Sequence, residues 1–272
     1  RWGAGPCQHS RVLHYTTGIR DRGGPDEARP KLVLVHGFTQ TLTSWDQVVQ
    51  RLLEDPQWQH AEIVRVDLPG HGGSGGVPLG FPQTARAISE IGGGKAIYLG
   101  YSMGGRLCLQ LALDHPCRAV ILLGSSPGIA DKTERSARHA SDDTLAMSIE
   151  RDGVPAFMDR WLAQPMFATL RPSEEDLAAR HANSAAGLAT ALRELSAGTQ
   201  DPLWDRLGEI DVPTLLMAGA LDTRYASLAE DMAAAIGDNA TTTIVPGAGH
   251  AAHLEQPDAF VSLVTDFLAL LS

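Results

Sequence analysis

The sequence predicts an α/β fold with a mainly parallel, doubly wound sheet and an inserted helical cap. Short apolar runs alternate with amphipathic helical patterns, which is typical of parallel sheets covered by helices on both faces. About ninety residues separate the apolar runs that end near Leu123 and begin at Thr214, far more than one crossover helix needs. With 272 residues, 43% of them hydrophobic, the chain can build one large domain with such an insertion.

The strands are predicted from apolar runs bounded by glycine, proline or polar residues. In chain order they are Val12–Thr17, Lys31–Val35, Glu62–Leu68, Ala96–Gly100, Arg118–Leu123, Thr214–Ala218 and Thr241–Val245. A Gly/Pro/charge-rich loop over Asp21–Pro30 separates the first two.

The helices are predicted from apolar residues that recur at helical spacing and from capping side chains. In the core they are Ser44–Glu54 with Ser44 as cap, Thr84–Ile91, Leu107–His115, Leu228–Ile236 and Pro257–Leu271. In the cap they are Arg135–Ile149, Val154–Leu162, Ser173–His181 and Leu188–Leu195, with Ser173 and Asp176 forming a capping box. We place the core at residues 1–127 and 211–272 and the cap at 128–210.

Composition excludes several classes of function. The net charge of −10 argues against nucleic acid and anionic membranes as partners, and no apolar run approaches the length of a membrane span. The cysteines are Cys7, Cys108 and Cys117, an odd number without metal spacing, and Cys108 fits core packing. The polar segment 1–11 lacks the apolar core of a signal peptide. We therefore expect a soluble, cytoplasmic protein; the sequence does not fix its oligomeric state.

The strongest motif is Gly-x-Ser-x-Gly at Gly100, Ser102 and Gly104, where a strand runs into a helix. In such a turn a side chain at either glycine position would clash, so glycine is required there. The turn points the Ser102 hydroxyl outward and directs free N–H groups of the following helix at whatever the serine attacks. A chance serine in a glycine-rich turn is the alternative.

Two further strand ends supply partners for Ser102. A serine hydroxyl needs a histidine to take its proton, and the histidine needs an acid to orient it. Asp222 and His250 each follow a predicted strand, at the edge of the sheet where Ser102 lies and in the order Ser, Asp, His. We expect the N–H groups of Met103 and Phe38 to form the oxyanion hole.

Two other motifs carry weaker chemistry. Gly70, Gly72 and Gly75 match G-x-G-x-x-G, but helix-breaking residues follow where a dinucleotide site needs a helix, so we expect a glycine-rich surface loop near the active site. His36, His71 and His253 are the other candidates for the catalytic histidine, and His36 fits a structural role better because it precedes the glycine of the oxyanion loop. His253 follows His250 by three residues, which is not the spacing of a helical H-E-x-x-H metal site. We expect no metal and no cofactor.

Beyond these motifs the chain resembles the α/β-hydrolase superfamily over nearly its whole length. Within it, the chain is similar to the 2-succinyl-6-hydroxy-2,4-cyclohexadiene-1-carboxylate synthases of menaquinone biosynthesis. The segments that carry this resemblance are 35–41, 100–106, 134–138, the cap's Trp-x-x-Gln-Pro-x-Phe at 161–167, and Asn183 with 187–189.

The resemblance implies an α/β-hydrolase fold and a lyase that eliminates pyruvate from a small polycarboxylate. It implies that Arg106, Arg138 and Arg224 hold substrate carboxylates, which arginine grips through two parallel hydrogen bonds. It also implies that Trp161 is a pocket aromatic and Tyr101 lies beside the nucleophile, although the family often has lysine where Arg224 stands. The alternatives are a serine hydrolase acting on esters or carbon–carbon bonds with the same three side chains, and a non-catalytic ligand receptor, which would more naturally lack part of them.

Overall fold

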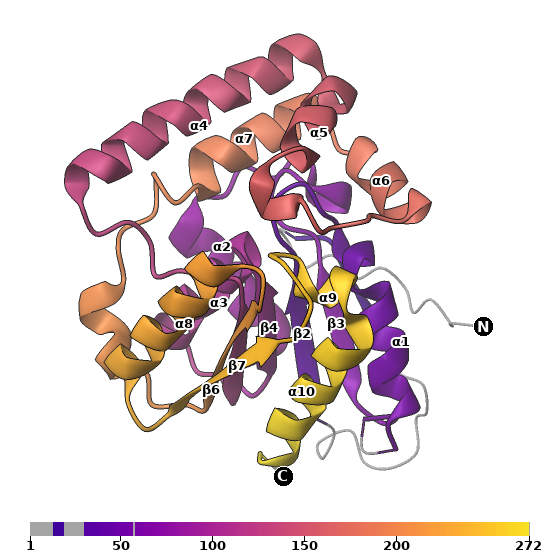
Figure 1. The fold of residues 1–272 in the computed structure, drawn as a ribbon, viewed down its shortest axis with the longest axis vertical. Helices are drawn as coiled ribbons and strands as arrows, with labels where there is room; N and C mark the ends of the chain where they lie inside the picture. Colours follow the sequence, from indigo (N-terminus) through magenta and orange to yellow (C-terminus); the bar gives the residue numbers. More distant parts are fainter. Residues whose placement is uncertain (1–12, 19–29, 57, 272) are drawn as a thin grey trace.

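The computed structural model describes residues 13–18, 30–56 and 58–271 (Figure 1). The predictions for the polar segment 1–11, for Cys7, for Val12 and for most of the loop over 21–30 lie outside the described residues.

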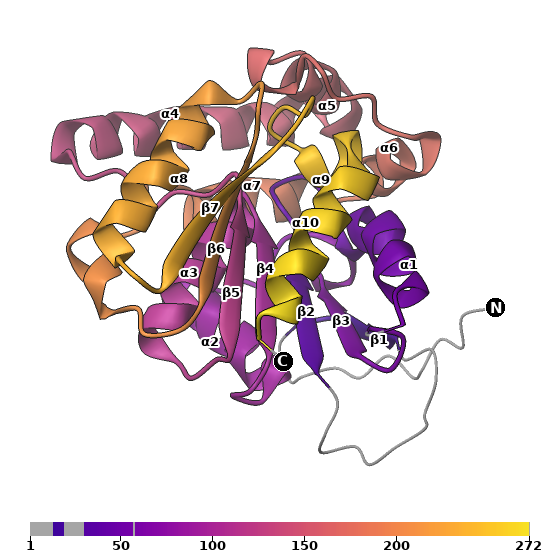
Figure 2. The same ribbon diagram turned by 60° about the horizontal axis from the view of Figure 1, so that its bottom comes forward.

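The sheet runs in the order β1-β3-β2-β4-β5-β6-β7, with β1 antiparallel to β3 and every other pair parallel (Figure 2). Its strands are β1 (Tyr15–Gly18), β2 (Lys31–Val35), β3 (Glu62–Val66), β4 (Ile97–Tyr101), β5 (Ala119–Leu123), β6 (Thr214–Gly219) and β7 (Ala240–Val245). Strand β4 is the central strand, with three strands on either side, so the residues that follow it lie at the middle of the carboxyl edge of the sheet. The predicted mainly parallel sheet is confirmed.

Helices cover both faces of the sheet. Helices α1 (Asp46–Glu54) and α10 (Pro257–Ala269) share one hydrophobic core with alternate strand residues such as Leu34 and Leu99. Helices α2 (Phe81–Gly92), α3 (Met103–Asp114) and α8 (Thr223–Ile236) share a second core with the opposite strand residues, such as Val33 and Tyr98. Because side chains alternate across a strand, both faces of these buried strands are apolar, which explains their continuous apolar runs.

Between β5 and β6 the chain leaves the sheet and forms the helical insertion, α4 (Lys132–Asp152), α5 (Val154–Leu162), α6 (Glu174–His181) and α7 (Ala185–Leu195). Figure 1 shows α4 and α7 side by side above the strand ends. The insertion has its own core, in which Ile149, Phe157, Leu188 and Leu192 are buried. It is not an independent body, because the ring of Phe38 from the sheet edge packs on this core.

Several local predictions need correction. Ser44 caps no helix: the chain first makes a 3₁₀ turn (η2, Leu42–Trp45) whose cap is Thr41, and Ser44 donates back to the Thr41 carbonyl. Helix α3 begins at Met103 rather than near Leu107, because the glycines at 104 and 105 continue the turn into the helix. Helices α4 and α8 also begin earlier, where Asp131 and Asp222 cap their first turns.

Other local predictions are confirmed. Val154–Leu162 is helical as predicted, and the Ser173 side chain accepts from the Asp176 N–H as in a capping box. Cys108 is fully buried in the core. Among the described residues, none of the helices combines the length and the hydropathy that crossing a bilayer requires.

Candidate active site

The turn between β4 and α3 holds Ser102 in an unusual backbone conformation, with φ at 51°. This region is costly for a residue with a side chain and is found where the surrounding structure enforces it. A Cβ on Gly100 would lie 2.5 Å from the Gly104 carbonyl oxygen, and one on Gly104 would lie 2.2 Å from the Val35 carbonyl oxygen. Both glycines of the motif are therefore required by close backbone approach.

The structure brings Ser102, His250 and Asp222 together from three different strand ends. His250 Nε2 lies 3.3 Å from Ser102 Oγ, and His250 Nδ1 lies 2.6 Å from Asp222 Oδ2. With Nδ1–H donating to the carboxylate, Nε2 is free to accept the serine proton. Asp222 also caps α8 through the Tyr225 N–H, which fixes its second oxygen.

The loop around His250 is held by an acid that the sequence did not point to. Glu255 accepts from the Gly249 N–H at 2.8 Å and from the Ala251 N–H at 3.0 Å, the two residues that flank His250. Gly124, with φ at 55°, lies beneath the histidine, and a Cβ there would lie 3.0 Å from His250 Cε1. The ring is thereby fixed from two sides.

Two backbone donors border the same space. Met103 is the first residue of α3 and Phe38 lies in the turn after β2, and both line the cavity together with Ser102. Within the described parts of the chain, neither N–H donates to a protein acceptor. Gly37 in this turn packs so tightly that a Cβ would lie 2.7 Å from the ring of Tyr101.

A cavity of about 520 Å³ lies between the strand ends and the insertion. Its walls come from the sheet edge, from α4 and α5 and from the segments that enter and leave the insertion. Of the residues predicted for the site, those in its lining are Phe38, Tyr101, Ser102, Met103, Arg106, Arg138, Trp161, Asp222 and Arg224.

Arg106 is buried at one end of this cavity, with 8% of its surface exposed. Its two terminal nitrogens donate to the Leu195 carbonyl at 2.6 Å and to Gln200 Oε1 at 2.8 Å, and its guanidinium lies over the ring of Phe81. Burial lowers the pKa of Arg106 to about 10, so it stays charged at neutral pH. Arg106 therefore ties α3 to the segment that leaves the insertion.

Arg138 and Arg224 line the cavity from two different elements, α4 in the insertion and α8 beside the sheet. Arg138, on α4, uses only its Nε to contact both carboxylate oxygens of the buried Asp142, at 2.9 and 2.8 Å. That geometry leaves the two terminal amino groups of Arg138 free. Arg224 is exposed beside Tyr225 and has no carboxylate partner in the described residues.

Aromatic rings form the remaining wall. Trp161 lies edge-on to Phe38, with ring centroids 5.2 Å apart, and also contacts Phe157 and Phe167. Its indole N–H is buried without a hydrogen-bond partner among the described residues. Apart from that donor, the rings give this side of the cavity an apolar surface.

Tyr101 lies beside the nucleophile, as the resemblance implies. Its ring contacts those of His250 and His253 at tilted angles, with centroids 5.3 and 4.5 Å away. Burial raises the pKa of the Tyr101 hydroxyl well above its usual range, so this residue stays neutral.

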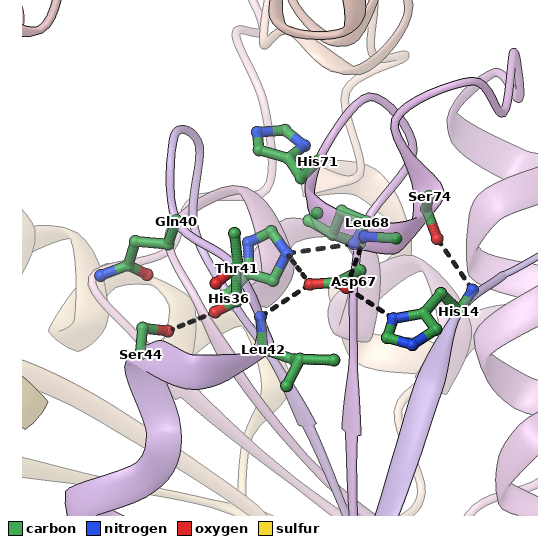
Figure 3. A network of polar contacts seen from close by, with 12 residues as sticks. His14, His36, Gln40, Thr41, Leu42, Ser44, Asp67, Leu68, His71 and Ser74 are labelled. Atoms are coloured by element: carbon green, nitrogen blue, oxygen red, sulfur yellow. Dashed lines mark hydrogen bonds and ion pairs between the residues drawn. The ribbon is translucent and has the colours of Figure 1, made fainter. Parts of the chain in front are cut away.

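The other histidines near the site are buried in structural roles. His36 Nε2 accepts from the Leu68 N–H and its Nδ1 donates to the Gly37 carbonyl (Figure 3). Asp67 accepts from His14 and from the Leu42 N–H in the same network. His253 lies between aromatic rings and accepts from Gln40. In the described residues no three ligand side chains gather in a metal-binding arrangement.

The sequence reasoning missed Asp142, Tyr225 and Glu255. Asp142 follows Arg138 by four residues in a predicted helix, which is a recognisable ion-pair spacing. Glu255 lies five residues after His250, and no general spacing rule links a loop acid to the N–H groups on either side of a histidine.

Known proteins share the sequence pattern of this chain along most of its length. The model of the alpha/beta hydrolase family matches residues 32–263. A putative 2-succinyl-6-hydroxy-2,4-cyclohexadiene-1-carboxylate synthase from Bacillus subtilis is 34% identical over 261 residues, covering 90% of this chain and 92% of that protein. The synthase of that name from Serratia proteamaculans is 33% identical over 266 residues, covering 93% and 97%.

A solved structure agrees with these relatives. MenH from S. aureus has a TM-score of 0.84 and 28% sequence identity, covering 95% of this chain and 98% of that one. The chain belongs to the alpha/beta hydrolase family, and it is an enzyme of that fold, similar along most of its length to proteins named 2-succinyl-6-hydroxy-2,4-cyclohexadiene-1-carboxylate synthase.

Proposed function

We propose that this enzyme eliminates pyruvate from 2-succinyl-5-enolpyruvyl-6-hydroxy-3-cyclohexene-1-carboxylate to give 2-succinyl-6-hydroxy-2,4-cyclohexadiene-1-carboxylate, a step of menaquinone biosynthesis. The observation that carries the proposal is the cavity itself, which places the Ser102 hydroxyl in one space with Arg106, Arg138 and Arg224. Three guanidinium groups suit a substrate with three carboxylates. The names of the relatives support the same reaction.

The geometry supports the following steps. His250, oriented by Asp222, accepts the Ser102 hydroxyl proton, and the serine oxygen takes the acidic ring proton of the substrate. The electrons of that C–H bond form an enolate, whose oxygen the N–H groups of Phe38 and Met103 stabilise. The enolate carbonyl then re-forms as the C2–C3 double bond is made, the existing C3–C4 double bond moves to C4–C5, and the bond from C5 to the enolpyruvyl oxygen breaks. That group leaves as pyruvate after taking the proton from His250, so no metal or cofactor takes part.

The arginines determine binding rather than proton transfer. Arg138 and Arg224 present free donors, and Trp161 supplies an apolar face for the substrate ring. Arg106 is held in place by Leu195 and Gln200, which lowers the entropic cost of gripping a carboxylate.

The domain division at residues 128 and 210 remains our proposal for the boundaries of the cap.

The test compares the lyase with a serine hydrolase, which would use the same three side chains. The enolpyruvyl substrate is supplied and pyruvate is followed through lactate dehydrogenase, with p-nitrophenyl acetate assayed in parallel. We expect efficient pyruvate release and at most slow ester cleavage. Rapid ester turnover without any pyruvate would favour the hydrolase.

A substitution sharpens the comparison. Arg106→Ala should cost about 2 kcal/mol or more in kcat/KM on the polycarboxylate, because a charged hydrogen-bond partner is lost. It should change p-nitrophenyl acetate cleavage little. Equal losses on both substrates would assign Arg106 to the fold rather than to substrate binding.

A further inference from the structure

Thr39 follows Phe38 in the turn after β2 and adopts a left-handed backbone conformation, with φ at 71°. A β-branched residue rarely accepts this conformation unless its surroundings impose it. Thr39 is fully buried, and its N–H, hydroxyl and carbonyl each form a hydrogen bond with a residue distant in sequence.

The backbone N–H of Thr39 is held by the glycine-rich loop after β3. It donates to His71 Nε2 at 3.1 Å, while His71 Nδ1 donates to the Pro69 carbonyl at 2.9 Å. His71 therefore accepts only in its neutral form. Burial lowers its pKa to about 3, so that form persists at neutral pH.

The other two groups of Thr39 are held by the helical insertion. Arg180, at the end of α6, donates to the Thr39 hydroxyl at 2.6 Å. Asn183, in the link between α6 and α7, donates from its side-chain amide to the Thr39 carbonyl at 2.8 Å. Both side chains are buried, with 2% and 6% of their surfaces exposed.

Asn183 also joins the insertion to the glycine-rich loop. Its side-chain oxygen accepts from the Gly72 N–H at 2.8 Å, so one amide bridges two core loops that are far apart in sequence. The backbones of Gly70 and Gly187 touch beside it, and a Cβ on Gly70 would lie 2.2 Å from the Gly187 carbonyl oxygen. Asn183 and the close approach of Gly70 to Gly187 therefore join three segments at one point: the insertion, the turn after β2 and the glycine-rich loop.

We propose that Asn183 is a positioning residue for the reaction, through which the helical insertion sets the backbone of the oxyanion turn. The inference rests on the proposed oxyanion role of the Phe38 N–H. The Phe38 N–H belongs to the peptide between Gly37 and Phe38, whose carbonyl accepts from the Gln40 N–H at 3.3 Å. That Gln40 N–H belongs to the peptide between Thr39 and Gln40, whose carbonyl accepts from Asn183. Arg180 and His71 hold the hydroxyl and the N–H of Thr39 from either side, so the contact of Asn183 is passed to the Phe38 N–H through the turn. The insertion thus acts on catalysis through the backbone as well as by closing over the substrate.

The test compares kcat and KM for pyruvate release in variants of Asn183. In Asn183→Ala we expect kcat for pyruvate release to fall about tenfold or more while KM stays within about threefold, because a displaced N–H weakens transition-state binding rather than substrate binding. Asn183→Asp retains the acceptor for Gly72 but loses the donor to Thr39. It should lose kcat to a similar extent, which assigns the effect to the Thr39 contact.

Ser184→Ala is the matched control. Ser184 is the next residue and caps α7 by accepting from the Gly187 N–H at 3.0 Å, but it does not contact Thr39. The control should lower the melting temperature with kcat unchanged. Wild-type kcat in Asn183→Ala, or an equal fall in kcat in Ser184→Ala, would overturn the proposal.

A second readout keeps this inference separate from the proposed reaction. A fluorophosphonate forms a P–O bond to Ser102 with loss of fluoride, and its phosphonyl oxygen occupies the oxyanion hole without using the arginines. The labelling rate should fall in Asn183→Ala by about the same factor as kcat. If wild-type protein labels rapidly but releases no pyruvate, the proposed reaction fails, and the labelling rates alone then decide the role of Asn183.

Discussion

The strained backbone of Ser102, with φ at 51°, goes together with a hydroxyl that lies 3.3 Å from His250 Nε2. The Ser102→Ala variant should lose pyruvate release by about a thousandfold or more, because the group that transfers the proton is gone. The fold should survive, since the hydroxyl projects into a cavity. Pyruvate release and circular dichroism measure the two outcomes, and near-normal turnover in a folded variant would contradict the assignment.

Glu255 is the second residue to test. In Glu255→Gln one of the two flanking N–H groups faces an amide NH₂ instead of an acceptor, so the His250 loop should loosen at a cost of about 1.5 kcal/mol or more. We expect kcat to fall about tenfold at unchanged KM.

Glu90→Gln serves as the control for Glu255→Gln, because among the residues that the structure describes Glu90 pairs with nothing but the exposed Arg86 on α2. Its steady-state kinetics should match those of the wild type. A Glu255→Gln variant with wild-type kcat would show that the His250 loop keeps its conformation without the Glu255 carboxylate.

At the scale of single residues, the sequence predicted the three side chains that the structure brings together and did not indicate the contacts that hold them in place. Ser102, Asp222 and His250 can be found because each follows a strand, and parallel strands end at one edge. Glu255 and Asn183 act on backbone groups that become neighbours only in three dimensions. No periodicity in the chain records such contacts.

Among the elements, the glycine-rich loop 70–75 differs most from its prediction as a surface loop. Gly70 and His71 are buried against the insertion, although Gly72 and Gly73 remain exposed. Gly70→Ala should lower the free energy of unfolding by about 2 kcal/mol or more, because φ is 81° and the new Cβ would strike the Gly187 carbonyl.

The neighbouring Gly76→Ala is the control for this loop, because a Cβ there meets nothing within 4 Å. Urea unfolding should separate the two variants clearly. Equal stabilities would mean that the insertion shifts to make room at Gly70.

Helix boundaries were predicted less well than helix existence. The sequence placed the start of α3 and α8 several residues late because glycines and an aspartate read as loop residues. In both helices the first turn holds a residue that we propose for the site: it carries Met103 in one case and is capped by Asp222 in the other. The site therefore uses the positions at which helix propensity is weakest.

On the scale of the whole molecule, buried neutral histidines make stability depend on pH. Burial lowers the pKa of His36, His71 and His253, that of His71 to about 3. The unfolded chain takes up protons below about pH 6.5, whereas the folded chain does not. Stability is therefore complete above that pH and falls as the pH drops below it, by about 1.4 kcal/mol per pH unit for each such histidine.

Urea midpoints at pH 7.5, 6.0 and 5.0 measure this dependence. His71→Gln keeps an acceptor for the Thr39 N–H. It should lower the pH dependence of the free energy of unfolding by the amount that corresponds to one proton. A midpoint that stays constant from pH 7.5 to 5.0 would mean that the histidines are protonated without loss of the fold.

The separate hydrophobic core of the helical insertion has a consequence for protein engineering. An insertion with its own core can in principle be exchanged between relatives if its contacts with the sheet edge, such as that with Phe38, are kept. Grafts of this kind are a natural route to new substrate ranges, since the insertion supplies Arg138 and Trp161. A graft that lacks Arg180 and Asn183 would still fold and close over its new ligand, yet would leave Thr39 unsupported. Chimeras should therefore divide into those that bind and turn over a substrate and those that only bind it, according to whether the insertion carries Arg180 and Asn183.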